Sequence, residues 1–515
     1  MSQVNAAALS AFERGNAAFD RADWVPAEEA YRESLAHQPN DAPVRFNYGL
    51  LLLATRRPLD AARELGAAVA ADPGFALARV NLGAALHLLK RFADADEQFV
   101  TAAALGCTTP ELNLNWSSTL TELGRFAEAA ALLEPLAVRP DYCADAVAQL
   151  ALIRLLEGRA DEAVELYRAL PRLGVRSAEA RAKLGMALLA AGRWLEGWAE
   201  CEALDRESHA GGSRPRWNGE SLTGRTILLH CEQGLGDLIQ FARFADDLAD
   251  RGATVLLQCA KEAEELLATH RGIARVVREP LPDCDYRLSL LCVPRVLNIT
   301  RENVPARVPY LHADAARRDF WRTRLPGRGT FRVGLVWRGS EGFLRNRWRS
   351  IDLEELAPLF GVAGVTFISL QKGLGLDELA RLGPTLGLHD LGPVYQAGNL
   401  ADTAAVVAEL DLVISVDTSV AHLTGALARP GWIVVSEPPS DWRWERDVNT
   451  SRWYPTLRLF RQQKFGEWKP AIEEVCQALT RHLAGPVSRN HVEAQPRRVF
   501  SLSPCGRGWP RFADG

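Results

Sequence analysis

The sequence predicts a multidomain protein in which an all-α solenoid is followed by an α/β region with two parallel sheets. Small and large residues recur at a fixed period of 34 over residues 8–206, which indicates a helical repeat array. From residue 225 onward, short β-branched runs alternate with helical stretches, as in parallel sheets that carry helices on both faces. Residues 207–224 lie between the two patterns, contain several Gly and Ser, and are expected to form a linker.

Three positions in each 34-residue unit define the repeat. The first is alanine in five units and glycine in the sixth: Ala27, Ala61, Ala95, Ala129, Ala163 and Gly197. A small residue precedes each of these by twelve positions, and in most units a large residue such as Tyr31 follows by four. We interpret each unit as two antiparallel helices whose backbones approach at the small residues, with the large residue filling the gap to the next unit.

This pattern resembles the tetratricopeptide repeat and implies six such units. An alanine-rich composition explains one alanine but not a series of small residues in register. Solenoids of this kind usually offer a concave surface to a peptide or protein, so we expect a protein or peptide partner there. The alternative is that the array serves only for assembly, as in a homodimer.

Composition and charge exclude several classes of protein. The 515 residues carry 60 basic and 64 acidic side chains in no long run of one sign, so nucleic acid is not an expected partner. The nine cysteines are scattered without a C-x-x-C pair, which suits reduced thiols rather than a disulfide scaffold. The N-terminus lacks a signal-peptide pattern, and no segment reaches the roughly 18 uninterrupted apolar residues that a membrane span requires. We therefore expect a cytoplasmic protein without a transmembrane segment.

The α/β region divides into two similar halves at the glycine-containing segment 326–330. We expect two Rossmann-like lobes, over residues 225–325 and 330–485, that face each other across a cleft. The second lobe should end near a helix at 469–483, and residues 486–515, which have no period and many Arg, Pro and Gly, should be disordered. The expected strands are 226–231, 254–259, 331–337, 365–370, 411–416 and 432–436, with helices at 261–270 and 402–410.

The first expected strand ends in a glycine turn that contains Gly234 and Gly236 and leads to Asp237. A dinucleotide fingerprint needs a third glycine, where this chain has Ile239. Asp237 would also place a negative charge where the helix amides would hold a phosphate, so we reject a phosphate cradle. Two interpretations of Asp237 stay open: an N-cap worth about 1 kcal/mol, or a carboxylate that takes a proton from an acceptor hydroxyl.

The second lobe has a complementary element at 411-DLVISVDTSVAHLTGALARP-430. A strand ends at Asp417, and a helix begins at about Thr418. The first amides of that helix, the Thr418 hydroxyl and the His422 imidazole could all face a diphosphate. The alternative for His422 is a histidine of the core.

Two further loops follow strands of the second lobe. The segment 337–350 concentrates four arginines opposite the expected helix N-terminus, and this grouping predicts phosphate contacts. The four are Arg338, Arg345, Arg347 and Arg349, and a second loop at 369–373 contributes Gln371 and Lys372. The triplet 283-DCD-285 has no second ligand cluster, so we predict no metal site.

A set of segments resembles the bacterial tetratricopeptide-repeat glycosyltransferases: EQGLGDLIQFARF, GLVWRGS…RS, SLQKG, ADTAA, DLVISVDTSVAHLTGALARP, DWRW and WYPTLRLFRQ. The catalytic half is similar to the heptosyltransferases of glycosyltransferase family 9 and, more distantly, to the repeat-bearing O-GlcNAc transferase. The resemblance covers most of residues 8–483. It implies a GT-B fold and inverting, metal-independent transfer, without a cofactor, from a nucleotide-diphosphate sugar held by the C-terminal lobe.

The resemblance also implies roles for individual residues. Asp237 corresponds to the catalytic base of the heptosyltransferases, and the segment from Asp417 to His422 to the one that holds donor phosphates or ribose. Together with the loop residues, the implied donor-binding set is Gly236, Arg345, Arg349, Ser350, Gln371, Lys372, Asp417, Thr418 and His422.

The sequence departs from the family pattern W-x-G-N-P-x-H-x-N-D-x-x-R-S in the loop at 337–350. Its Asn, Pro, His, Asn and Asp are replaced by Ser340, Glu341, Phe343, Arg345 and Asn346. Two smaller departures are Asn399, where Asp is usual, and Leu238, where Thr is common. The expected base and phosphate-binding helix are kept, while the identity of the donor stays open.

Three functions are consistent with these observations. The first is a glycosyltransferase whose repeats recruit a protein or peptide acceptor. The second is heptosyltransferase-like transfer to a lipid-linked or glycan acceptor, with repeats used only for assembly. The third is a non-enzymatic scaffold that carries a degenerate transferase domain, an interpretation favoured by the altered loop.

Overall fold

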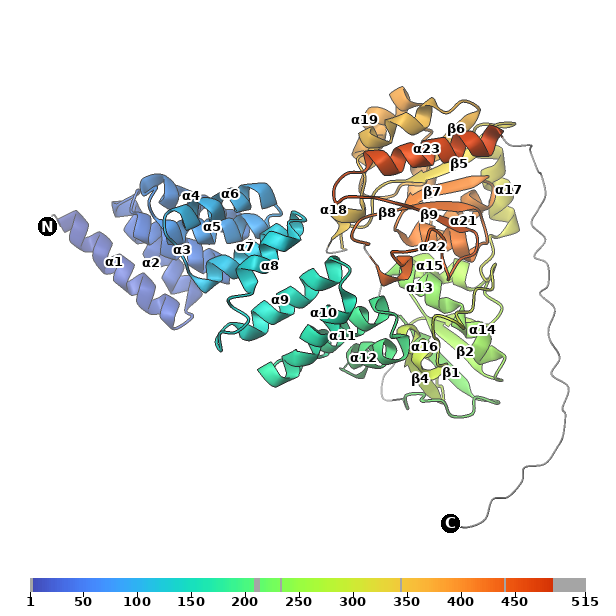
Figure 1. The fold of residues 1–515 in the computed structure, drawn as a ribbon, viewed down its shortest axis with the longest axis horizontal. Helices are drawn as coiled ribbons and strands as arrows, with labels where there is room; N and C mark the ends of the chain where they lie inside the picture. The colour runs from blue at the N-terminus through green and yellow to red at the C-terminus, as the bar shows by residue number, and fades with distance from the viewer. Residues whose placement is uncertain (1–2, 208–213, 232–233, 343–344, 440, 485–515) are drawn as a thin grey trace, which may run out of the picture.

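The computed structural model describes residues 3–207, 214–231, 234–342, 345–439 and 441–484. It consists of an N-terminal helical solenoid and two α/β lobes, with the last solenoid helix packed into the core of the first lobe (Figure 1). No helix within these ranges is long and apolar enough to cross a membrane. The tail expected at 486–515 lies outside the described residues.

Six helix pairs form the solenoid, and the second helix of each pair begins 34 residues after that of the pair before. This confirms the prediction of a tetratricopeptide-like helical solenoid. The helices are α1 (Gln3–Asp20) and α2 (Trp24–His37), α3 (Ala42–Ala54) and α4 (Pro58–Ala71), α5 (Ala76–Leu88) and α6 (Phe92–Ala104), α7 (Pro110–Glu122) and α8 (Phe126–Leu133), α9 (Cys143–Leu156) and α10 (Ala160–Ala169), and α11 (Ala178–Ala190) and α12 (Trp194–Glu207).

The small residues of the repeat lie where the two helices of a pair cross. The five repeat alanines have 0% of their surface exposed, as predicted: Ala27, Ala61, Ala95, Ala129 and Ala163. A Cβ added at Gly15 would lie 2.6 Å from the ring of Tyr31, so glycine is needed for this close approach. The large residue at the third repeat position therefore packs against the small residue of its own helix pair. Tyr31 also reaches the next pair, with its ring 6.3 Å from that of Tyr48.

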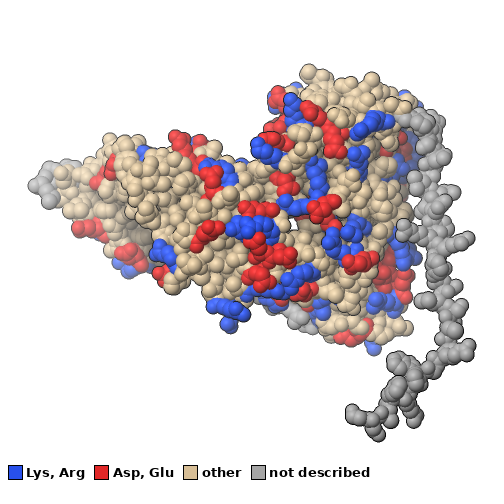
Figure 2. All heavy atoms as spheres, viewed as in Figure 1, with Lys and Arg blue, Asp and Glu red and all other residues tan. Residues whose placement is uncertain are grey.

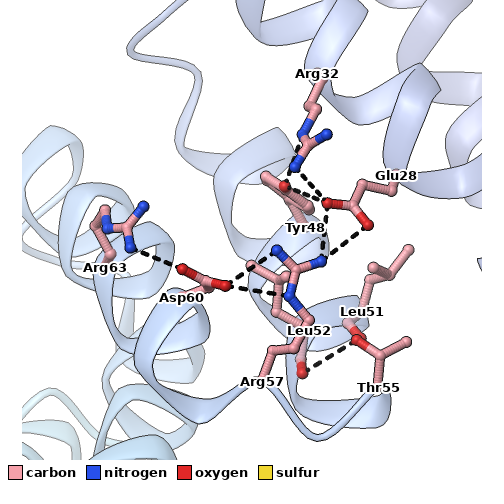
Figure 3. Close-up of polar contacts among 9 residues, drawn as sticks. All are labelled: Glu28, Arg32, Tyr48, Leu51, Leu52, Thr55, Arg57, Asp60 and Arg63. Carbon is pink, nitrogen blue, oxygen red and sulfur yellow. Dashed lines mark hydrogen bonds and ion pairs between the residues drawn. The ribbon is translucent and has the colours of Figure 1, made fainter. Parts of the chain in front are cut away.

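The turn inside each helix pair is also periodic. Its middle residue has a φ between 57° and 81° in every pair: Ala22, Arg56, Lys90, Gly124, Gly158 and Gly192. In five pairs the next residue is an arginine that pairs with an acidic residue three positions later, in the first turn of the second helix. Figure 3 shows Arg57, which contacts Asp60 at 3.0 Å and also Glu28 of the preceding pair at 2.9 Å. Arg57 therefore joins neighbouring pairs.

The turns of the last three pairs contact the lobes, and in these pairs the middle residue is glycine. A Cβ added at Gly124 would lie 2.3 Å from Phe465. A Cβ at Gly158 would lie 3.1 Å from Arg446, and one at Gly192 would lie 3.2 Å from Arg301. The first three pairs have other residues at this position with a similarly positive φ. The glycines are therefore explained by the close approach of the lobes, not by φ alone.

Each lobe contains one sheet in which every strand pairing is parallel. The strand orders are β3-β2-β1-β4 in the first lobe and β6-β5-β7-β8-β9 in the second. These sheets agree with the predicted α/β region, although β3, β4 and β9 were not among the expected strands. The strands are β1 (Thr226–His230), β2 (Thr254–Gln258), β3 (Arg275–Val277), β4 (Tyr286–Ser289), β5 (Phe331–Val336), β6 (Val365–Ser369), β7 (Leu412–Val416), β8 (Gly431–Val435) and β9 (Leu457–Arg461).

The α-helices of the two lobes cover these sheets and form the contact between them (Figure 1). They are α13 (Leu235–Ala242), α14 (Phe244–Ala249), α15 (Lys261–Leu267), α16 (Val293–Val296), α17 (Ala315–Arg324), α18 (Asn346–Arg349), α19 (Leu376–Leu386), α20 (Gly392–Ala397), α21 (Leu400–Ala408), α22 (Ser419–Ala426) and α23 (Lys469–Ala484). Short 3-10 helices are η1 (Leu170–Leu173), η2 (Leu290–Cys292), η3 (Leu353–Gly361) and η4 (Trp442–Trp444).

The two lobes meet where α13 of the first packs against α22 of the second. We call this contact the interlobe seam. Arg243, directly after α13, is buried in the seam and donates to the carbonyl of Trp453 at 2.8 Å and to the hydroxyl of Tyr310 at 3.2 Å. The seam is therefore held by buried hydrogen bonds as well as by apolar packing.

Two segments extend the lobes beyond their expected limits. Part of the expected linker packs on the first lobe. Trp217 is fully buried there, and its backbone N–H donates to the carbonyl of Arg287 at 3.0 Å. Helix α17 precedes the expected second lobe but packs against α21 of that lobe. The indole N–H of Trp321 there donates to Asp402 at 3.1 Å.

Candidate functional site

Asp237 lies in the first turn of α13, directly after the glycine turn that follows β1. The N-cap of α13 is Gly234, and Asp237 is the third residue of the helix. The interpretation of Asp237 as an N-cap is therefore wrong. Its Oδ1 accepts a hydrogen bond at 2.5 Å from Nη2 of Arg443, which belongs to the other lobe.

Arg443 connects Asp237 with a second carboxylate. It lies in η4, the short helix formed by the DWRW segment, and its side chain is nearly fully buried. Its Nη1 donates to Asp441 at 2.6 Å, while Nη2 donates to Asp237. The guanidinium also lies over the rings of Phe241 at 5.1 Å and Trp442 at 4.8 Å. These contacts hold the cation in a defined orientation at the interlobe seam.

Charges of both signs surround the Asp237 carboxylate. Burial is the largest cause that raises its pKa, and the negative charges of Asp441 and Asp417 act in the same direction. The positive charge of Arg443 opposes this shift without cancelling it, so the pKa stays above its usual range. The side chain is 27% exposed, which leaves it accessible to a reacting hydroxyl. A raised pKa makes this carboxylate a better proton acceptor.

The second lobe brings Asp417 and Thr418 to the same region, at the end of β7. Thr418 is the N-cap residue of α22, but its hydroxyl lies 3.1 Å from that of Ser415 instead of capping the helix. Nη1 of Arg349 lies 3.8 Å from Asp417. The predicted groups Asp237, Asp417, Thr418 and Arg349 thus gather around the first turns of α13 and α22.

His422 is buried in the interlobe seam beneath the glycine turn. Its Nδ1 lies 3.1 Å from the hydroxyl of Tyr454, and burial lowers its pKa to about 3, so the imidazole is neutral near pH 7. A Cβ added at Gly236 would lie 2.9 Å from the imidazole Cδ2. The second glycine of the turn is therefore needed to make room for His422. These surroundings match the core interpretation of His422, and its contact with a donor stays a prediction.

Gln371 holds two loops of the second lobe together. Its amide oxygen accepts hydrogen bonds from the N–H groups of Trp337 at 3.1 Å and Arg338 at 2.9 Å. Its amide nitrogen donates to the carbonyls of Arg338 and Lys372. The side chain is almost fully buried, so its position in this structure is that of a loop support.

Lys372 and Ser350, two other predicted donor-binding residues, also make contacts within the second lobe. The ammonium of Lys372 donates to the carbonyl of Gly398 at 2.6 Å and lies 4.5 Å from the centre of the Tyr395 ring. Burial lowers the pKa of Lys372. The hydroxyl of Ser350 accepts a hydrogen bond from the N–H of Gly339 at 3.1 Å.

The arginines of the loop at 337–350 point in different directions. Arg345 faces the solenoid, with Nε 3.7 Å from a carboxylate oxygen of Glu122. Arg347 also faces the solenoid, where it donates to the Glu122 carbonyl and lies over the ring of Phe92 at 4.5 Å. Arg338 pairs with Glu378 in its own lobe. Arg349, by contrast, turns toward Asp417.

A cavity of about 640 Å³ lies between the solenoid and the second lobe. The lobe side includes Asp441 and Trp442, which are next to Arg443 in the chain. Figure 2 shows charged side chains of both signs gathered where the solenoid meets the lobes. The solenoid side is lined by residues of α9 and the residues 34 positions later in α11: Ala148, Gln149, Leu152, Leu155 and Leu156, then Ala182, Lys183, Met186, Leu189 and Ala190.

Within the described ranges, no group of three or more His, Cys, Asp or Glu side chains is arranged to hold a metal ion. In the triplet at 283–285, Asp285 accepts a hydrogen bond from the N–H of Thr226 at 2.8 Å and pairs with Arg225 at 2.9 Å. It therefore joins the start of β4 to the start of β1. Metal-independent chemistry stays a prediction.

Sequence reasoning missed Arg443, which pairs with Asp237 across the seam, and Asp441, the second carboxylate bound by Arg443. Asp441 and Arg443 belong to the DWRW segment, which carried part of the family resemblance but was assigned no role. The available signal was an arginine between two tryptophans, a setting that indicates a cation held against aromatic rings.

The chain matches no protein-family model. It is 30% identical over 322 residues to Protein FlbA of Caulobacter vibrioides, a match that covers 57% of this chain and 53% of FlbA. The chain thus spans about half the length of this curated relative. Among solved structures, PilW, a widely conserved type IV pilus biogenesis factor, is 22% identical and covers 40% of this chain and 96% of its own, with a TM-score of 0.35. YrrB, a TPR protein with an unusual peptide-binding site, is 20% identical and covers 35% and 95% of the two chains, with a TM-score of 0.31. The similarity to these two solved structures extends over 40% of this chain or less.

Proposed function

We propose that this protein is a glycosyltransferase that moves a sugar from a nucleotide-diphosphate sugar to a hydroxyl group of a polypeptide bound by the solenoid. The observation that carries the proposal is the pairing of Asp237 with Arg443. A carboxylate whose pKa is raised, and which is still partly exposed, lies 2.5 Å from a cation of the opposite lobe. A proton acceptor and a positive charge at one seam are what inverting transfer from a diphosphate donor requires.

In the proposed reaction, Asp237 accepts the proton of the acceptor hydroxyl while that oxygen attacks the anomeric carbon. The new carbon–oxygen bond forms on the face opposite the leaving group, and the bond from the anomeric carbon to the diphosphate breaks. The diphosphate leaves with the bonding electrons. Arg443, Arg349 and the first turn of α22 supply the positive potential that stabilises its charge.

The contact between Arg443 and Asp237 suggests a separate role for each residue in the reaction. As long as the cation pairs with Asp237, it lowers the basicity of that carboxylate. A bound diphosphate competes for the same guanidinium, so donor binding would leave Asp237 a stronger base. Arg443 is therefore proposed to stabilise the leaving group, with Asp441 keeping it oriented.

Two features support a polypeptide acceptor. The cavity beside Asp441 is lined on the solenoid side by residues of α9 and α11, so a chain bound there would lie close to the seam. In addition, half-buried amide side chains recur every 34 residues along the first helices of the pairs, at Asn47, Asn81, Asn115 and Gln149. Three of these amides also bond within the solenoid: Asn47 donates to Asn16, Asn81 donates to the carbonyl of Leu77, and Gln149 accepts from Ser117. An amide has two N–H donors and an oxygen acceptor, so each keeps capacity for the backbone of an extended peptide.

A specific observation favours the scaffold alternative. Gln371, Lys372 and Arg345, which were expected to bind the donor, all contact the protein itself. If those contacts persist, the donor must be held by fewer groups. A scaffold would need only the solenoid and would bind no nucleotide sugar.

The test begins with melting curves of the wild-type protein with a panel of nucleotide sugars, because a donor that binds the folded state raises the melting temperature. The sugar that gives the largest shift is then used in transfer assays with Asp237→Asn. Loss of the base should reduce turnover by roughly 10²–10⁴-fold without weakening donor binding, because Arg443 then no longer pairs with a carboxylate at position 237. Asp250→Asn, a change at an exposed aspartate of the same lobe, is the control and should retain wild-type turnover. Wild-type turnover by Asp237→Asn would place the base elsewhere, and no shift with any sugar would favour the scaffold.

A further inference from the structure

The short helix α18 has one side on the solenoid and the other on the candidate donor site. Arg347 and Trp348 contact the third and fourth helix pairs of the solenoid. Arg349, the residue that follows, lies beside Asp417. A helix of four residues has too few internal hydrogen bonds to be stable alone, so its position must be set by the surfaces around it.

The solenoid side of α18 is an aromatic contact. The Trp348 ring meets Phe126 of α8 edge-on at 6.2 Å and Phe465 of the second lobe at 5.3 Å. Phe126 and Phe465 in turn lie 6.1 Å apart, so the three rings form one cluster. Edge-to-face pairs of this kind are favourable beyond the area that they bury.

A second contact fixes the same helix from the end of α7. The guanidinium of Arg347 donates to the carbonyl of Glu122, the last residue of α7, and covers the Phe92 ring of α6 at 4.5 Å. A cation at a helix C-terminus pairs with the unsatisfied carbonyls and with the helix dipole. Gly124, two residues later, lacks the Cβ that would meet Phe465 at 2.3 Å. The solenoid is therefore shaped to receive this part of the lobe.

The site side of α18 consists of polar contacts that lead to the predicted phosphate region. The Asn346 amide donates to the carbonyl of Gly339 at 3.2 Å and accepts from Nε of Arg349 at 3.3 Å. Nη1 of Arg349 lies 3.8 Å from Asp417. The direction of the Arg349 guanidinium is thus tied to the position of α18.

We propose that Phe126 and Glu122 of the solenoid are positioning residues for the donor site, acting through Trp348 and Arg347 to set Arg349 for a nucleotide diphosphate. This inference rests on the proposed function and deepens it. The solenoid takes part in donor binding as well as in holding the acceptor. It also gives a reason for one change in the altered loop, since Arg345, which replaces an Asn of the family pattern, faces Glu122 of the solenoid.

The test compares Phe126→Ala with Phe46→Ala. Phe46 is also a half-buried phenylalanine of the solenoid, but it packs on Phe75 at 4.9 Å, inside the solenoid. Binding of ADP, CDP, GDP, UDP and dTDP is measured by calorimetry on the full-length proteins. For the nucleotide that binds wild type best, we expect Phe126→Ala to raise Kd about tenfold, which is about 1.4 kcal/mol. Phe46→Ala should leave Kd unchanged.

Two further measurements separate positioning from general destabilisation. Arg347→Ala, a change on the lobe side, should raise the nucleotide Kd and the donor KM in the same way, with the acceptor KM unchanged. Hydrogen exchange of residues 345–350 without ligand should be faster in Phe126→Ala and in Arg347→Ala than in wild type or Phe46→Ala.

The outcomes distinguish the two proposals. If wild type binds a nucleotide diphosphate and both Phe126→Ala and Arg347→Ala bind it equally well, the positioning role is refuted while the proposed function stands. If no nucleotide diphosphate binds wild type, the proposed function falls. The hydrogen-exchange rates of residues 345–350 then decide whether the solenoid holds α18 in place. Unchanged rates in both variants would show that it does not.

Discussion

At the scale of single residues, the candidate site depends on contacts between groups that are far apart in the chain. Arg443 reaches Asp237 across the interlobe seam, and His422 fills the space that Gly236 leaves open. Each pair joins one residue of the first lobe to one of the second. A change in either member should therefore affect both the stability of the seam and the geometry of the site.

The first prediction concerns the close approach at Gly236. A Cβ there would lie 2.9 Å from His422, so Gly236→Ala should overpack the seam and destabilise the protein by about 1–3 kcal/mol. His422→Ala removes the obstructing ring, so the double variant should be more stable than the sum of the single changes predicts. Urea unfolding of the four proteins measures this coupling. Additive losses would show that the two residues do not share this space.

The second prediction concerns pH and Asp237. Because the pKa of Asp237 is raised in the folded protein, the protonated form contributes stability at low pH that is lost as the pH rises through the folded pKa. Asp237→Asn cannot ionise. The variant should therefore melt at a higher temperature than wild type at pH 7, and the difference should shrink as the pH falls toward about 4. Melting curves at both pH values are compared with those of Asp250→Asn, and a difference that grows on acidification would contradict the prediction.

These residues show how much of the candidate site could be predicted from the sequence alone. Asp237, Asp417 and Thr418 were selected because each lies where a recognisable strand leads into a helix. Arg443 was not, because its partner lies 206 positions away and no local pattern links them. Arg345 was expected at the donor, but it faces Glu122 of the solenoid, and a contact between separately predicted domains cannot be derived from the pattern of either.

At the scale of elements, the repeat was predictable because one steric requirement recurs in every unit. Small residues at the helix crossings leave a period in the sequence, as at Ala27 and Gly15. Strand β3 left no such signal, since it has only three residues, and β9 is part of a segment that was recognised only as a motif. Helix α18 is too short for any periodicity, and its neighbours determine where it lies.

The third prediction tests the packing of α6. Ala95 has 0% exposed surface at a helix crossing, and Ala95→Leu should overpack it and destabilise the protein by about 1–3 kcal/mol. Ala93→Leu is the matched control, because Ala93 lies exposed on the same helix and leucine is a good helix former. Urea unfolding with both variants checks the difference. Equal stability of the two would mean that the crossing has room for a larger side chain.

At the scale of the whole molecule, a buried ionic contact joins the solenoid to the first lobe. Glu202 of α12 has 2% of its side chain exposed and pairs with Arg216 at 2.9 Å and with Arg295. Together with the aromatic cluster around Trp198, this contact makes α12 part of the lobe core. The solenoid and the lobes should therefore unfold together.

The fourth prediction follows from this joint. Glu202→Ala removes the buried carboxylate that Arg295 contacts and leaves Arg216 paired with Asp205, a loss on the order of 3–5 kcal/mol. Water can hydrate both arginines and so offset part of this loss of stability, because the side chains of Arg216 and Arg295 are 14% and 30% exposed. Calorimetry of wild type should show a single unfolding transition, and that of Glu202→Ala two. Glu179→Ala, at an exposed position of α11, is the control and should keep one transition.

The glycine turns of the last three helix pairs have a consequence for how the gene can evolve. Each of these turns faces its own partner on the lobes: Phe465, Arg446 or Arg301. Duplication of one 34-residue unit ahead of the third pair would lengthen the solenoid and leave these contacts untouched. A unit inserted among the last three pairs would move the turns before it away from the residues that fit them, because α12 holds the C-terminal end of the solenoid in the lobe core. Descendants of this gene are therefore expected to gain and lose repeats at the N-terminal end, while the three units next to the lobes keep their number.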